Sequence, residues 1–178
     1  AQEHGAEVPF SRPAALSGDT SSELDAWRHA IRNTPELLDQ PEKATFVSLP
    51  ATSPLRNTTD VDRAIERYLE GDIDLVFGIT PSTRSPWLNM VTLDNHGLLN
   101  VVNSGSTAIR RQDTPPVFDV TTCVYVGNVQ YILNCERLME GRVGAVEIPP
   151  ERALDIDTEF DLHLADLLLK HPMKAPKS

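Results

Sequence analysis

The sequence predicts an α/β domain in which helices pack against a mostly parallel central sheet. Segments with apolar residues at helical spacing alternate along the chain with short apolar or β-branched runs. The run IDLVFGIT at 73–80 is almost wholly apolar, which is typical of a strand buried on both faces of a sheet. The chain has 178 residues, enough for one domain with a substantial core.

The first half of the chain predicts a helix, a strand and a second helix. The first helix is expected over 19–33, where Thr20 and Glu23 resemble a capping box. A short buried strand is expected at 44–50, before the turn-rich sequence ATSPLRN. The sequence TTDVDRAIERYLEG at 58–71 has the clearest helical pattern and ends at a glycine.

The second half predicts a hairpin, two more strands and two helices. The hairpin is expected over 89–103, with Asp94-Asn95-His96-Gly97 as its turn. The remaining elements are expected as a strand at 117–127, a short helix around 129–139, a strand at 143–149 and a final helix with an apolar stripe of Phe160, Leu164, Leu167 and Leu168. In a parallel sheet, ligands bind where loops leave the carboxyl ends of strands. The loops at 51–57, 81–87 and 149–157 therefore form the candidate site.

Two aspartates, Asp155 and Asp157, flank Ile156 just before the final helix. In an extended segment, their side chains point to the same side. They could hold a divalent cation, or they could be a helix cap and a solvated neighbour. On spacing alone the capping role is favoured, with Asp157 or Thr158 as the cap.

Charge and cysteine content disfavour several classes of partner and of site. The net charge of −10, from 16 basic and 26 acidic residues, disfavours a nucleic-acid backbone or an anionic membrane as the main partner. No apolar run approaches the roughly 20 residues that a membrane span needs. Cys123 and Cys135 form neither a metal-ligand pattern nor a disulfide framework, which predicts a cytoplasmic location.

Four motifs occur in a diagnostic order: GAEVPFSRPAALSGDTSS, LPATSPLRNTTDVDRAIE, RRQDTPPVF and DIDTEFDL. Over essentially 5–170, the chain resembles the acylneuraminate cytidylyltransferase family. The resemblance implies a three-layer α/β/α domain of the nucleotide-diphospho-sugar transferase type, spanning 1–170. It also implies that the hairpin insert at 86–112 protrudes and reaches a partner subunit, which makes a homodimer. The tail at 171–178 is expected to be flexible.

The activity that the resemblance implies is transfer of CMP from CTP to a sialic-acid-like, nine-carbon 2-keto sugar acid, with release of pyrophosphate. Asp155 and Asp157 match the carboxylates with which the family binds Mg²⁺, and Mg²⁺ uses one or two protein carboxylates together with phosphate oxygens. Arg111 matches a catalytic anion contact in a loop over the substrate, where the planar guanidinium suits phosphate or carboxylate.

Five further residues match substrate-binding positions of the family. Arg110 and Gln112 flank the catalytic arginine, and Thr52 and Ser53 lie in the loop beside nucleotide and sugar. Asn89 stands at the entry to the hairpin. Four of them have a structural alternative: an exposed patch for Arg110, turn formation for Thr52 and Ser53, and hairpin pairing for Asn89.

Two departures from the family leave the function open. The sequence begins at AQEHGAEVPF, where family members have already used roughly 50 to 60 residues, including a Gly-rich basic phosphate loop. Without that segment, the strand at 44–49 is expected to become an edge that invites oligomerisation or pairing with a separate fragment. The alternative function is therefore a non-catalytic truncated remnant or assembly module that retains the fold and the dimer surface.

The identity of the sugar substrate is open as well. Asp119 stands where many family members carry an arginine for the sugar carboxylate, and Pro50 replaces a common glutamine. A nucleotidyltransferase for another base or sugar shares the fold, but the DIDTEFD and RRQD motifs together argue against it.

Overall fold

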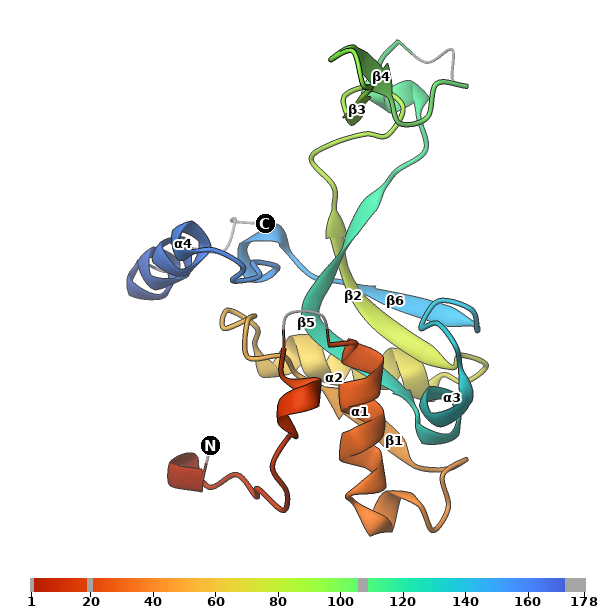
Figure 1. The fold of residues 1–178 in the computed structure, drawn as a ribbon, viewed down its shortest axis with the longest axis vertical. Coiled ribbons are helices and arrows are strands. Elements are labelled where there is room, and N and C mark those ends of the chain that lie inside the picture. The colour runs from red at the N-terminus through yellow and green to blue at the C-terminus, as the bar shows by residue number, and fades with distance from the viewer. Residues whose placement is uncertain (1, 19–20, 106–108, 172–178) are drawn as a thin grey trace.

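A computed structural model describes residues 2–18, 21–105 and 109–171. Its main sheet has four strands in the order β1-β5-β2-β6 (Figure 1). The strands are β1 (Thr45–Ser48), β2 (Leu75–Pro81), β5 (Phe118–Asn128) and β6 (Val143–Glu147). Among the described strands, β1 lies at one edge of the sheet, as expected.

The sheet is mixed, which corrects the prediction of a mostly parallel sheet. β5 runs antiparallel to both β1 and β2, and only the pair of β2 and β6 is parallel. The cause is the path of the chain: it leaves the sheet through β2, forms the projecting hairpin, and returns through β5 beside the strand it left (Figure 1). A β-branched strand pattern predicts the position of β5 but not its direction.

The four α-helices within the described ranges begin where polar side chains cap them. They are α1 (Glu23–Arg32), α2 (Thr58–Leu69), α3 (Val129–Asn134) and α4 (Glu159–Lys170). The side chain of Ser22 caps α1, whereas Thr20, which was expected to cap it, lies outside the described residues. Asn57 with Asp60 forms a capping box on α2, and Thr158 with Asp161 forms one on α4. Short 3₁₀ helices cover Gln2–His4, Ala14–Leu16, Pro35–Leu37, Arg111–Asp113 and Pro150–Arg152.

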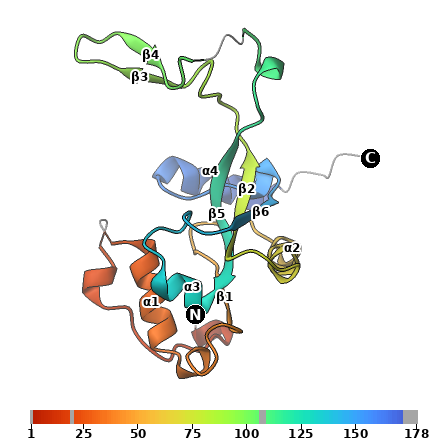
Figure 2. The same ribbon diagram turned by 90° about the vertical axis from the view of Figure 1, so that its right-hand side faces the viewer.

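Helices cover both faces of the sheet, with α1 and α3 on one face and α2 on the other (Figure 2). Because strand side chains alternate, Leu75 and Phe77 of β2 pack toward α1, while Val76 packs toward α2. This two-sided burial confirms the prediction for the apolar run at 73–80. Trp27 of α1 is central to the first core, with its ring 5.0 Å from that of Tyr125 in β5.

The predicted hairpin is present as β3 (Val91–Leu93) and β4 (Leu99–Val101), and it projects far from the main sheet (Figure 1). Its turn is fixed by Asp94, whose carboxylate accepts hydrogen bonds from the amides of His96 and Leu98. Gly97 has a φ of +77°, a conformation that glycine adopts without steric cost. The position and the turn of the hairpin therefore follow from local sequence.

The final helix is where expected, but its predicted stripe is only partly buried. Leu164 and Leu168 are half-buried, whereas Leu167 is exposed and Phe160 is 72% exposed. Ala165 is the buried residue of α4. The helix around 129–139 is also shorter than predicted, because Cys135 adopts an extended conformation after Asn134. The tail expected at 171–178 lies beyond the described residues except for His171.

No helix within the described ranges is long and apolar enough to cross a membrane.

Replacing Trp27 by alanine is expected to lower the free energy of unfolding by about 3 to 5 kcal/mol, because it empties the centre of the core between α1 and β5. Urea denaturation followed by circular dichroism measures the change. Leu69→Ala is the matched control, since Leu69 is 68% exposed, and it is expected to cost less than about 0.5 kcal/mol. Equal losses in the two variants would contradict this assignment of the core.

Candidate functional site

A cleft of about 870 Å³ opens between the start of α1, the loop after β1 and the aspartate-containing loop after β6. We call it the α1–β1 cleft. Its polar lining includes Arg12, Glu23, Ser48, Thr52, Thr122 and Asp157. Two of the three loops expected to form the site, 51–57 and 149–157, thus meet at one cleft.

An arginine fixes the loop after β1 through hydrogen bonds to backbone carbonyl groups. The Arg56 guanidinium donates to the carbonyl oxygens of Ser53 and Cys123, at 3.0 Å each, and to that of Pro50. Thr52 lines the cleft, whereas Ser53 is fully buried. No local pattern in the sequence marks Arg56, although an arginine next to a tight turn can satisfy carbonyl groups that no strand pairs.

A β-bulge brings Thr122 to the same place. The register of β5 against β2 jumps from Tyr125 opposite Phe77 to Thr121 opposite Gly78, which leaves 122–124 without partners in β2. Such bulges redirect side chains. The Thr122 hydroxyl lies 2.6 Å from that of Ser53, so Ser53 joins the loop to β5 while Thr52 faces the cleft.

The two aspartates lie in a loop rather than in a strand, and they have different environments. Asp157 is exposed and lines the cleft. Asp155 is half-buried, and its Oδ1 atom is buried without a hydrogen-bond partner in the part of the chain that the structure describes. Between them, the Ile156 amide donates to the Thr52 carbonyl at 2.9 Å, which joins the two loops. Thr158 caps α4, so neither aspartate is needed as the cap.

The field around Asp155 is negative. Burial and the charge of Asp155 raise the pKa of Glu23, the first residue of α1. Burial, Glu23 and Asp155 together raise the pKa of Tyr125. A cation beside Asp155 would relieve this repulsion and give its unpartnered oxygen a ligand.

The donor set fits Mg²⁺ but not a metal held by protein alone. Within the described ranges, no group of three or more His, Cys, Asp or Glu residues could hold a metal ion. Asp155 and Asp157 could supply two carboxylates, with a substrate phosphate and water completing the coordination. A cation held by two carboxylates would need an anionic ligand to complete its coordination.

A buried ion pair supports the aspartate loop from α2. Arg152 donates two hydrogen bonds to the fully buried Asp60, with Nε–Oδ2 at 2.8 Å and Nη2–Oδ1 at 2.9 Å. Burial would raise the pKa of Asp60, but the hydrogen bonds from Arg152 and Asn57 and the charge of Arg63 outweigh it and hold that pKa below its ordinary value. Neither residue stands out in the sequence, because nothing local links positions 92 residues apart.

The predicted substrate contacts around Arg111 lie away from this cleft. Arg111 donates to the carbonyl oxygens of Ser82 and Thr83, and Gln112 lies beside it in a separate cavity of about 450 Å³. Arg110 is paired with Asp113 at 3.0 Å. The structure thus does not bring these side chains to Asp155 and Asp157 within one chain.

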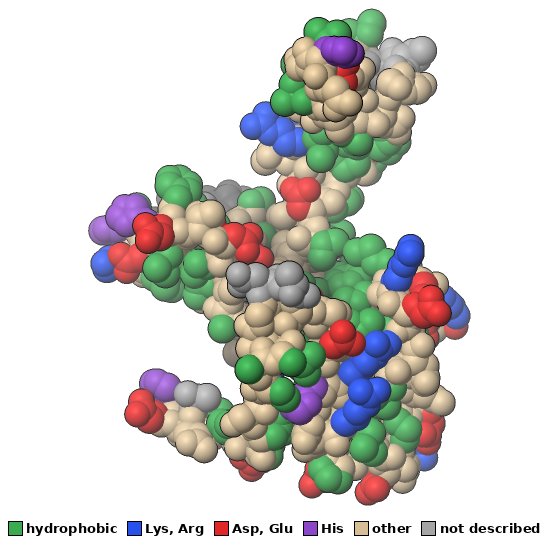
Figure 3. Space-filling view, in the orientation of Figure 1, with side chains coloured by type: hydrophobic (Ala, Val, Ile, Leu, Met, Phe, Trp, Pro, Cys, Tyr) green, Lys and Arg blue, Asp and Glu red, His purple; other side chains and the backbone are tan. Residues whose placement is uncertain are grey.

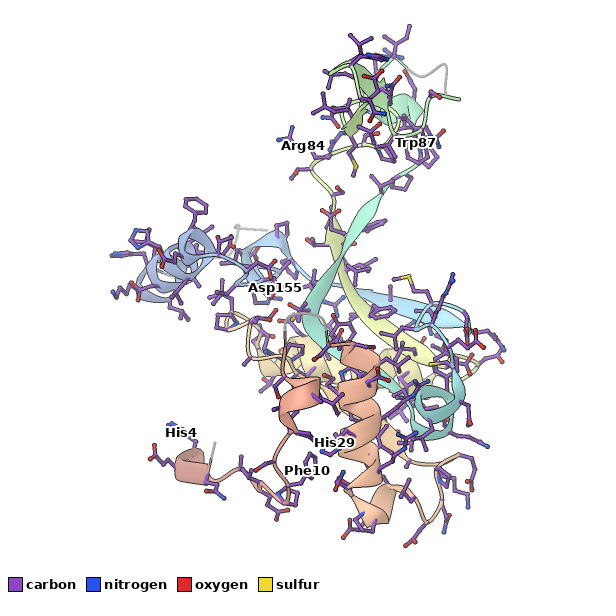
Figure 4. The ribbon with its side chains drawn as sticks, viewed as in Figure 1. His4, Phe10, His29, Arg84, Trp87 and Asp155 are labelled. Carbon is purple, nitrogen blue, oxygen red and sulfur yellow. The ribbon has the colours of Figure 1, made fainter. Side chains whose placement is uncertain are left out.

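Asn89 has a structural contact: its Oδ1 accepts a hydrogen bond from the Ser85 amide at 2.7 Å. Figure 4 shows Asp155 beside the main sheet, whereas Arg84 and Trp87 lie at the base of the projecting hairpin. The third expected loop, 81–87, therefore lies at the base of the projecting hairpin and not at the α1–β1 cleft.

Neither cysteine has the character of a nucleophile. Both are buried. Burial and the nearby Asp60 carboxylate raise the pKa of Cys123 to about 11, and burial raises that of Cys135. A thiol with a raised pKa is mostly protonated at neutral pH and therefore unreactive.

Known proteins resemble the chain over nearly its full length, although no family model matches it. Post-translational flagellin modification protein B of Campylobacter coli is 25% identical over 170 residues, covering 96% of this chain and 71% of that protein. CMP-N,N'-diacetyllegionaminic acid synthase of Campylobacter jejuni is 28% identical over 177 residues, covering 99% and 74%. N-acylneuraminate cytidylyltransferase of Streptococcus agalactiae is 28% identical over 159 residues, covering 89% and 37%.

Asp60→Asn is expected to cost about 2 kcal/mol of unfolding free energy at pH 7, because it removes the charge from a buried pair whose arginine is partly solvated. Since the pKa of Asp60 is lowered in the folded protein, its contribution is present above the ordinary pKa near 4 and is lost as the pH falls through the lower folded value. The difference between wild type and variant should therefore shrink below about pH 4.

Urea denaturation at pH 7, 5 and 3.5 tests this dependence. Asp62→Asn, at an exposed position of the same helix, is the control and is expected to show little change. A difference between wild type and Asp60→Asn that stays constant with pH would contradict the lowered pKa.

Proposed function

We propose that this chain, which belongs to the acylneuraminate cytidylyltransferase family, transfers CMP from CTP to a sialic-acid-like, nine-carbon 2-keto sugar acid and releases pyrophosphate. The observation that carries the proposal is the buried, unpartnered carboxylate oxygen of Asp155, two residues before Asp157, which lines the α1–β1 cleft. The names of the relatives support the chemistry, because they include sialic, legionaminic and pseudaminic acid enzymes.

In the proposed reaction, the anomeric hydroxyl oxygen of the sugar attacks the α-phosphorus of CTP and forms the new P–O bond, its proton passes to solvent, and the bond between the α-phosphorus and the bridging oxygen breaks, so that pyrophosphate leaves. Asp155 and Asp157 would hold Mg²⁺, which neutralises phosphate charge when it is bound. Arg12 adds a positive charge to the lining of the cleft, and Thr52 and Thr122 offer hydroxyl groups for orientation. Holding the two reactants in line in this way lowers the barrier mainly through positioning.

We further propose a homodimer built on the hairpin, with the three-layer arrangement of the family around the sheet. Exposed apolar side chains gather on the projecting segment (Figure 3), namely Met90, Val91, Leu93, Leu98, Leu99 and Val102. Monomers rarely leave so contiguous an apolar surface in water, which favours a protein partner.

The second candidate function is a non-catalytic assembly module. The same apolar hairpin supports it, as does the position of Arg111 and Gln112 away from the aspartate cleft. An assembly module keeps the hairpin contact but has no need of a cation at Asp155. Activity measurements on Asp155 therefore separate the two functions.

The wild-type chain is expected to release pyrophosphate from CTP and Mg²⁺ with one member of a panel of sialic, legionaminic and pseudaminic acids. Asp155→Asn keeps the size of the side chain but removes its charge, and should lower the rate by about a hundredfold or more. Asp166→Asn, on the exposed part of α4, is the control and should leave the rate unchanged. A folded wild-type chain that releases nothing with any sugar would favour the assembly module.

Replacing Leu98, Leu99 and Val101 together by serine is expected to convert the dimer to monomer, because it replaces three apolar side chains of the hairpin, two of them exposed, by polar ones. Sedimentation velocity measures the change, and a thermal melt checks that the main sheet stays folded. Leu69→Ser and Leu169→Ser, both exposed outside the hairpin, form the control. A dimer that survives the triple substitution would refute the hairpin interface.

A further inference from the structure

The loop that carries the aspartates is attached to the rest of the domain at three points. At its start, the Ile148 amide donates to the Ile79 carbonyl at 2.7 Å. In its middle, Arg152 forms the double hydrogen bond to Asp60. After Asp155, the Ile156 amide donates to Thr52 at 2.9 Å. Asp155 lies between the second and third points, so its position depends on both.

In the middle attachment, the residue that Arg152 contacts, Asp60, is itself held in place by α2. Asp60 is fully buried in the first turn of α2, and its Oδ2 also accepts a hydrogen bond from the Asn57 amide at 3.1 Å. The same helix packs Ala64, also fully buried, against the second core. Asp60 is therefore fixed by its helix before Arg152 contacts it.

The double hydrogen bond between Arg152 and Asp60 fixes the aspartate-containing loop relative to α2. A guanidinium that uses Nε and Nη2 on both oxygens of one carboxylate is fixed in direction as well as in distance. Arg152 is three residues before Asp155, at the end of the short 3₁₀ helix Pro150–Arg152. A buried ion pair adds little net stability compared with apolar residues of the same shape, so stability alone is a weak reason for its presence.

We infer that Asp60 and Arg152 are positioning residues that hold Asp155 and Asp157 in the arrangement that binds a divalent cation. The inference rests on the proposed function, because it assigns the cation to the same two aspartates. Neither Asp60 nor Arg152 lines the α1–β1 cleft, so their effect passes through the loop.

The main test compares Arg152→Lys with wild type in two measurements besides activity. Lysine keeps the charge but cannot form the double hydrogen bond. Mn²⁺ is titrated into the protein together with CTP, whose phosphates complete the coordination, while the signal of free Mn²⁺ is followed by electron paramagnetic resonance; the same titration without protein gives the Mn²⁺ that CTP binds by itself. Amide hydrogen exchange is measured at Ile156. We expect Mn²⁺ binding to weaken by roughly tenfold, as for supports of metal ligands, and exchange at Ile156 to become faster.

Arg67→Lys is the matched control, because Arg67 forms a surface ion pair with Glu70 on the same helix. It should change neither Mn²⁺ binding nor exchange at Ile156. If Arg152→Lys fails to fold, the double variant Asp60→Asn with Arg152→Met replaces it, since that variant leaves no unpaired buried charge. The double variant is expected to fold, to bind Mn²⁺ more weakly and to exchange faster at Ile156.

The outcomes separate this inference from the proposed function. Wild-type binding of Mn²⁺ by a folded Arg152→Lys or double variant would overturn the inference, whatever the activity. A wild-type chain that binds Mn²⁺ but releases no pyrophosphate would contradict the proposed function alone. If the wild type binds no Mn²⁺, the assignment of a cation to Asp155 and Asp157 is wrong. Hydrogen exchange at Ile156 then tests whether Arg152 positions the loop: faster exchange in Arg152→Lys supports that role, and unchanged exchange overturns it.

Discussion

The pairing of β5 with both β1 and β2 is the constraint on which the other features of the structure depend. One face of β5 supplies Tyr125 to the core around Trp27, and the other supplies Val124 and Val126 to the core under α2. The bulge in the same strand brings Thr122 to the α1–β1 cleft. Gly78 permits this close pairing, because a Cβ atom there would lie 2.7 Å from the Thr121 hydroxyl. Core, cleft and projecting hairpin therefore share one strand.

Local signals in the sequence predicted most elements of this fold. Asn57, Thr158 and the turn around Asp94 fix the ends of their elements through contacts within four residues, so a short window of sequence contains the needed information. The direction of β5 is different, because it is set by a chain excursion of nearly forty residues between β2 and β5. Antiparallel return after a projecting hairpin leaves no mark in the composition of the strand.

The candidate site was predictable to the extent that its residues lie in turns after strands. Thr52 and Asp157 do line one cleft, and Asp155, two residues before Asp157, has a buried oxygen without a partner among the described residues. Asp60, Arg56 and Arg152 were missed, since their roles arise from contacts between distant segments. The substrate contacts of Arg111 and Gln112 stay a prediction: motif order placed them in a loop over the substrate, and in the structure they line a separate cavity at the end of the β2–β5 ribbon.

The charge around the cleft bears directly on what the proposed reaction needs. The chain has a net charge of −10, and Glu23, Asp155 and Asp157 lie at or beside the cleft with Arg12 as the nearby cation. A triphosphate entering this field would meet repulsion that one exposed arginine only partly offsets. A divalent cation between the aspartates and the phosphates reverses the sign of that interaction. The same carboxylates that repel a free nucleotide would therefore attract its metal complex. The placement of Asp155 through Arg152 and Asp60 would then serve binding as well as chemistry.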